Sequence, residues 1–179
     1  MSIAPEKLKD YILRLKTTSI HSVKQAENLS VLLELCRYEH DQADRANNYA
    51  MLKNQNSIHS QLKDIKNYKF MCKTIQSRDD SVVVTLFDLL LLLGDYENFL
   101  DVLTEASFLQ GVIKVYRTTQ IRPIKLKTLT FLNRLLNVAD TQQKASQTEK
   151  QSVVAQVAIE LVNRGVPVTH VDDLHSIMS

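Results

Sequence analysis

The feature that most constrains this chain is an apolar run at residues 82–93, "VVVTLFDLLLLL". It is twelve residues long and contains Thr85 and Asp88, whereas a bilayer-spanning helix needs about 20 apolar residues. A helix that is apolar nearly all round is typical of a buried position. The alternative is an exposed leucine surface that binds a partner helix. We expect residues 89–93 to form part of a packed core.

Helical periodicity extends beyond this run. Apolar residues recur at spacings of three and four almost from end to end, and three glycines and three prolines leave little turn chemistry for β-hairpins. The chain is therefore predicted to be all-α. The first expected helix begins at Pro5, and the second follows an N-cap at Ser22. Further helices are expected near residues 61–77, 80–93, 95–105, 107–118, 123–138, 148–164 and 170–178. The stretch 139–150, "ADTQQKASQTEK", is either a polar connection or an extended helix end.

An internal repeat accompanies the helices. A shift of 42 residues places "SVVVTLFDLLLLL" on "PIKLKTLTFLNRLL" and "YKFMCKTIQS" on "QGVIKVYRTT". A looser copy of the repeat precedes these two, and its alignment with them begins at Val23. The polar segment 44–60 falls outside this period and is predicted to be an insertion, with an exposed loop near residues 54–57. We therefore expect deletion of residues 54–57 to leave stability nearly unchanged.

The repeat resembles armadillo and HEAT units, which have about 40–47 residues and two or three helices each. "EASFLQGVIKVYRTT" is similar to the linker glycine and second helix of an armadillo unit, and "IKLKTLTFLNRLLNVA" to its third helix. The resemblance implies one irregular α-solenoid of three to four units over residues 1–179. It also implies a non-catalytic scaffold or adaptor. Peptide-binding armadillo proteins carry a ladder of tryptophans, and this chain has no tryptophan, so the importin-like mode of peptide recognition is not expected.

Motifs with chemistry of their own are missing from the sequence. No glycine-rich phosphate loop, pair of close cysteines, HExxH or GxSxG occurs, so neither an enzyme nor a cofactor is predicted. Residues 170–175, "HVDDLH", offer two metal ligands at most on one helix face, which is too few for a metal site. Cys36 and Cys72 are expected to be buried and reduced, as in the cytosol or nucleus. The remaining histidines on polar stretches are expected at the surface: His21, His40 and His59.

Charge is segregated along the chain. Residues 79–105 contain seven acids and no base, whereas residues 106–139 contain no acid and six bases. One interpretation is that neighbouring solvated faces neutralise each other. The other is a basic strip that binds an acidic or helical segment of a partner protein, or alternatively nucleic acid. The candidate partner-binding residues are Lys114, Arg117, Arg122, Lys125, Lys127 and Arg134. We expect Arg117, Arg122, Lys125 and Lys127 to border the site.

Targeting signals are not expected either. Charged residues at Lys7, Lys9 and Asp10 interrupt the position where a signal peptide needs an apolar core. Together with the short apolar run, this pattern predicts a cytoplasmic or nuclear protein with no membrane segment and no small-molecule substrate.

Overall fold

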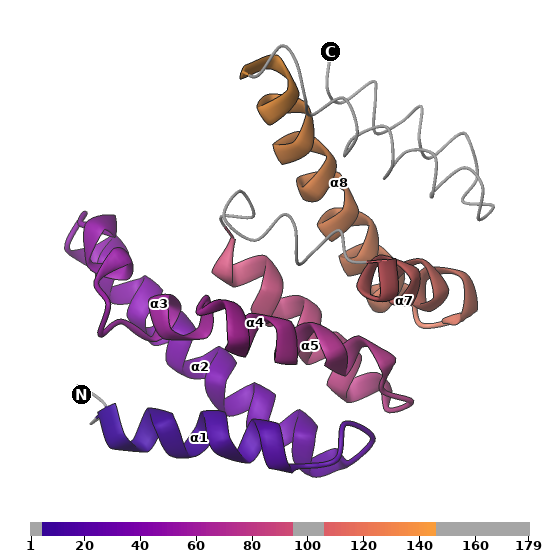
Figure 1. Ribbon diagram of the computed structural model, residues 1–179, viewed down its shortest axis with the longest axis horizontal. Coiled ribbons are helices and arrows are strands. Elements are labelled where there is room, and N and C mark those ends of the chain that lie inside the picture. The colour runs from indigo at the N-terminus through magenta and orange to yellow at the C-terminus, as the bar shows by residue number, and fades with distance from the viewer. Residues whose placement is uncertain (1–4, 95–105, 146–179) are drawn as a thin grey trace. The chain divides into compact units, whose positions relative to one another are not determined.

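A computed structural model describes residues 5–94 and 106–145 (Figure 1). The chain divides into two compact units, Met1–Gly94 and Asp95–Ser179. Every element in the described ranges is helical and none is a strand, which confirms the all-α prediction. The predicted helices at 95–105, 148–164 and 170–178 and the "HVDDLH" motif lie outside the described residues. The single domain over 1–179 stays a prediction.

The first unit begins with a helical hairpin of α1 (Pro5–Thr17) and α2 (Val23–Arg45). Ser22 is the N-cap of α2, as predicted, because its hydroxyl accepts a hydrogen bond from the Lys24 N–H at 3.2 Å. The buried amide of Gln25 donates to the Leu15 carbonyl at 2.8 Å. This bond joins the two helices at the end of the hairpin where the chain reverses.

A second hairpin packs on the first. It consists of α4 (Ile65–Lys73), its continuation η2 (Thr74–Gln76), and α5 (Asp80–Leu93). The largest contact between described elements lies between α2 and α5. The Arg78 N–H donates to His21 Nδ1 at 3.2 Å, which brings the starts of α2 and α5 together. Figure 1 shows the two helices running in the same direction.

The leucine run forms the core of this unit. Leu89, Leu90 and Leu93 are buried, and so are Val82 and Phe87 on the preceding turns. The core interpretation of residues 89–93 is therefore confirmed, with residues 91 and 92 only half-buried. The helix ends at Gly94, whose φ of +54° is costly for a residue with a Cβ atom.

The polar segment 44–60 differs from its prediction. It contains η1 (Tyr49–Lys53) and leads into α3 (Ile58–Leu62). Residues 54–56 are exposed, as expected, but Ser57 is buried and His59 is only 2% exposed. The prediction of a surface His59 is therefore wrong. His21 is exposed, as predicted, and His40 is half-buried.

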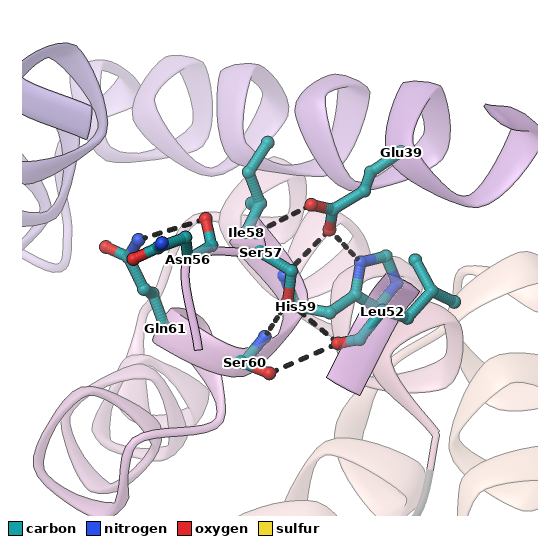
Figure 2. A network of polar contacts seen from close by, with 8 residues as sticks. All are labelled: Glu39, Leu52, Asn56, Ser57, Ile58, His59, Ser60 and Gln61. Atoms are coloured by element: carbon teal, nitrogen blue, oxygen red, sulfur yellow. Dashed lines mark hydrogen bonds and ion pairs between the residues drawn. The ribbon is translucent and has the colours of Figure 1, made fainter. Parts of the chain in front are cut away.

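Figure 2 shows what holds His59 inside. The Glu39 carboxylate, on α2, accepts hydrogen bonds from the Ile58 N–H at 2.9 Å and the His59 N–H at 3.0 Å. His59 Nδ1 lies 2.7 Å from the same carboxylate, whose side chain is 15% exposed. Burial raises the pKa of Glu39, but the hydrogen bonds from His59 and Ile58 outweigh it, so the pKa lies below its ordinary value.

Ser57 fastens the same segment from its other side. Its hydroxyl donates to the Leu52 carbonyl at 2.7 Å and accepts from the Ser60 N–H at 3.0 Å (Figure 2). Removing residues 54–57 would therefore take away the acceptor of the Ser60 N–H and one of the two hydroxyls that donate to the Leu52 carbonyl. Loss of hydrogen-bond partners in a partly buried segment is costly. The expectation of a nearly neutral deletion rested on an exposed loop, and the structure contradicts that premise at Ser57.

The second unit contains a third hairpin, α7 (Ala106–Thr118) and α8 (Arg122–Ala145). Phe108 and Phe131 meet edge to face with ring centroids 5.8 Å apart. Aliphatic side chains of both helices are also buried: Val112, Ile113, Ile124, Leu132 and Leu135. Since α8 continues to Ala145, residues 139–145 are an extended helix end rather than a connection.

Cys36 and Cys72 are free and buried, as predicted. Burial, with Glu39 nearby, raises the pKa of the Cys36 thiol despite the opposing charge of Lys63, so this thiol stays protonated. Among the helices of residues 5–94 and 106–145, none has the length and apolarity to cross a membrane.

Candidate functional site

The turn between α7 and α8 is short and firmly held. The Thr119 N–H donates to the Val115 carbonyl at 2.9 Å, which extends the end of α7. The Thr119 hydroxyl accepts from the Ile121 N–H at 3.2 Å, and the Ile121 carbonyl accepts from the Lys125 N–H at 3.2 Å. These bonds fix the path of residues 119–121, so the side chains around the turn are presented on a rigid support.

Apolar and basic side chains are exposed together at this turn. Leu126 is 65% exposed and Ile121 is 39% exposed. Arg117 and Arg122 are exposed, and Lys125 is half-buried. Residues four apart lie on one face of a helix, so Leu126 lies one turn beyond Arg122. We call these five residues, Arg117, Ile121, Arg122, Lys125 and Leu126, the α7–α8 patch.

A shallow groove adjoins the patch on α7. Its volume is about 260 Å³, and it is lined by Gln110, Ile113, Lys114, Arg117 and Thr118. Lys114 and Arg117 are three residues apart and both exposed, so they share one face of the helix. Arg117 therefore belongs to both surfaces, and Lys114 extends the basic character along α7.

Lys127 and Arg134 lie elsewhere on α8. They are seven residues apart, close to two helical turns, so they share a face with each other. Lys127 is rotated by about 200° from Lys125 around the helix axis. The six predicted residues are thus not one continuous strip. The fold groups Arg117, Arg122 and Lys125 around the turn and leaves Lys127 and Arg134 on a separate flank.

The electrostatics of the patch favour an anion. None of Arg117, Arg122 and Lys125 forms an ion pair with an acid in the described part of the chain. The first turn of α8 adds the partial positive charge of a helix N-terminus. Cations placed there are slightly unfavourable for the helix itself, and a bound carboxylate would relieve the repulsion.

Ile121 and Leu126, the apolar residues of the α7–α8 patch, were not among the predicted site residues. In the 42-residue repeat, Leu126 aligns with Val84, which is half-buried, and a match between two apolar residues does not mark Leu126 as exposed. A signal was available, because Leu126 does not fit the three-and-four spacing of the buried residues on α8. Those residues are Ile124, Thr128, Phe131, Leu132 and Leu135.

Within residues 5–94 and 106–145, no three side chains of His, Cys, Asp or Glu converge as a metal site requires. Comparison with protein-family models, curated proteins and solved structures finds no match for this chain. The resemblance to armadillo repeats therefore stays a prediction.

Proposed function

We propose that this protein is a non-catalytic interaction module that binds an acidic, helical segment of a partner protein through the α7–α8 patch. The observation that carries the proposal is the exposure of Leu126 and Ile121 among the three basic residues Arg117, Arg122 and Lys125. An apolar anchor flanked by cations matches an amphipathic segment with carboxylates beside its apolar face.

The same observation disfavours nucleic acid, the alternative class. Phosphate contacts need cations but gain nothing from an exposed leucine, and single-strand binding surfaces use aromatic side chains for base stacking. The patch contains two aliphatic side chains and no aromatic ring. A protein segment uses both the charges and the apolar area, so it accounts for more of the surface.

The scaffold role fits a solenoid of three to four units, which we propose as the arrangement of the whole chain. Its support is the stacking inside the first unit, where two successive hairpins place α2 and α5 in contact and in the same direction. These are the helices that the loose repeat alignment treats as equivalent. Equivalent helices that lie side by side are the defining feature of helical repeats.

Charge reversal at the patch tests the function. The variant Arg117→Glu/Arg122→Glu/Lys125→Glu is compared with Lys24→Glu/Lys53→Glu/Lys66→Glu, which makes the same change in net charge at exposed sites of the first unit. The probe is an acidic amphipathic helical peptide of about 15 residues, titrated by fluorescence anisotropy. We expect the patch variant to bind at least about tenfold more weakly, and the control variant to bind like the wild type.

The opposite results are equally clear. Equal losses in both triple variants would mean that the peptide responds to overall charge, and the patch assignment would be wrong. If a DNA duplex binds more tightly than the peptide, and its affinity falls steeply as the salt concentration rises, the patch is a nucleic-acid-binding site instead.

A further inference from the structure

A second surface lies in the first unit, between α1 and the corner formed by α3 and α4. It is a groove of about 410 Å³, and α1 contributes Lys9, Ile12, Leu13 and Lys16 to its lining. Ile12 is buried and Leu13 is 59% exposed. The α1 side therefore supplies an apolar floor at Ile12 and an exposed apolar edge at Leu13.

The charges on this side are arranged around Leu13. Lys9 and Lys16 stand four residues before and three residues after it, so all three lie along one face of α1. They span about 10 Å of helix. Both lysines are exposed, and neither forms an ion pair with an acid in the described ranges. A carboxylate in the groove would therefore meet unpaired cations on the α1 side.

The opposite side has different chemistry. It is lined by Gln61, Asp64 and Asn67. Asp64 is the N-cap of α4, because its carboxylate accepts from the Lys66 N–H at 3.0 Å. The side-chain amide of Asn67 donates to the backbone carbonyl of Gln61 at 2.9 Å, and that of Gln61 donates to the backbone carbonyl of Asn56 at 3.3 Å. The side-chain oxygens of Asn67 and Gln61 accept no hydrogen bond within the described residues. This side therefore presents acceptors and one negative charge.

The backbone of the walls decides what shape of ligand fits. Both walls consist of helices and their ends, so an extended segment would find no strand edge along which to form a ladder of hydrogen bonds. A helix brings its own backbone hydrogen bonds and packs its side chains between those of neighbouring helices. Only its side chains need to match the groove.

We propose that this groove binds an amphipathic helix of a partner protein. Its apolar face packs on Ile12 and Leu13, its acidic residues face Lys9 and Lys16, and a basic residue on its other flank faces Asp64. The asymmetry of charge sets the orientation of the helix about its own axis. This proposal depends on the first unit alone and stands or falls separately from the function proposed for the α7–α8 patch.

The test uses a designed helical peptide and the full chain. The peptide has about 15 residues, leucines along one face, glutamates on one flank and lysines on the other. Added to the ¹⁵N-labelled protein, it is expected to shift the amide signals of α1 and of residues 58–67. Leu13→Asp should weaken binding about tenfold. The control Val23→Asp should not, because Val23 is similarly exposed at 63% but lies outside the groove lining.

A charge swap gives an independent test that does not depend on Leu13. Lys9→Glu/Lys16→Glu should weaken binding of the glutamate peptide by roughly three- to tenfold. A peptide with lysine in place of those glutamates should bind this variant with the original affinity. Wild-type affinity in both variants would overturn the proposal, and so would shifts confined to residues 117–126. Binding of anionic phospholipid vesicles without binding of the peptide would assign the surface to a membrane and also overturn it.

Discussion

Glu39 joins the long helix α2 to the start of α3 with one carboxylate. It accepts two backbone N–H groups and lies within hydrogen-bonding distance of the buried ring of His59. Hydrogen bonds to a charged acceptor are stronger than neutral ones, and a buried donor left without its partner is costly. A single acidic side chain therefore holds in place a segment whose composition is typical of a loop.

The pH dependence of stability should reveal this role. The pKa of Glu39 in the folded chain is lower than its ordinary value, so the unfolded chain binds the proton more readily. The stability contributed by Glu39 is therefore fully present above its unfolded pKa of about 4.3, and it is lost as the pH falls through the folded pKa. We expect the melting temperature of Glu39→Gln to fall less steeply below about pH 4.3 than that of the wild type.

The control is Glu34→Gln. Glu34 pairs with Arg37 at 2.7 Å, but both side chains are largely exposed, and such pairs contribute little. Its profile should follow that of the wild type. Parallel profiles for wild type and Glu39→Gln would show that the carboxylate contributes nothing specific.

Among the elements, α5 carries most of the core of the first unit. It is apolar on most sides because it packs against α2 and η2. Seven leucines, valines and phenylalanines of this helix are buried: Val82, Val83, Leu86, Phe87, Leu89, Leu90 and Leu93. Only a helix covered from several directions can bury so many apolar residues within four turns.

Truncation of the leucine helix should therefore be costly. Leu90 has no exposed surface, and Leu90→Ala should reduce the free energy of unfolding by about 2–5 kcal/mol, since it removes buried methyl groups and leaves a cavity. Leu126→Ala, at a 65% exposed position of α8, should change it by less than about 0.5 kcal/mol. Urea denaturation of both variants measures the difference. A cost at Leu90 as small as that at Leu126 would contradict the core assignment.

At the scale of the whole molecule, the stability of each compact unit either depends on the other unit or does not. In a helical solenoid each repeat contacts its neighbours, so stability is shared along the stack. Two independent domains would not share it. The proposed solenoid therefore makes a prediction that reaches from one unit to the other.

Hydrogen exchange can test this coupling. If the repeats stack continuously, Leu90→Ala should accelerate amide exchange in α7 and α8 as well as in α2 and α5. Leu132→Ala, at the equivalent buried position of the second unit, should likewise accelerate exchange in α2 and α5 as well as in α7 and α8. Mass spectrometry after timed labelling resolves the helices by peptide. Changes confined to the mutated unit in both variants would identify independent domains and exclude the continuous stack.

The sequence by itself determined that the described chain is helical and where most of its helices lie, although the helix predicted near 61–77 is divided at Asp64 between α3 and α4. Ser22 as an N-cap and the leucine core at residues 89–93 follow from local rules, because capping and periodicity act within a few turns of chain. The pairing of Leu90 with Leu132 as buried positions also came from the repeat. These features depend on short-range spacing, which is fully readable in a single sequence.

The tertiary structure alone decided which polar and apolar residues leave that pattern. His59 is buried because Glu39, 20 residues away, contacts it. The sequence around His59 does not predict that contact. Leu126 is exposed because the core contact of α8 uses a different face. Burial of a single side chain depends on what the fold brings against it, and that is a property of contacts between elements rather than of local sequence.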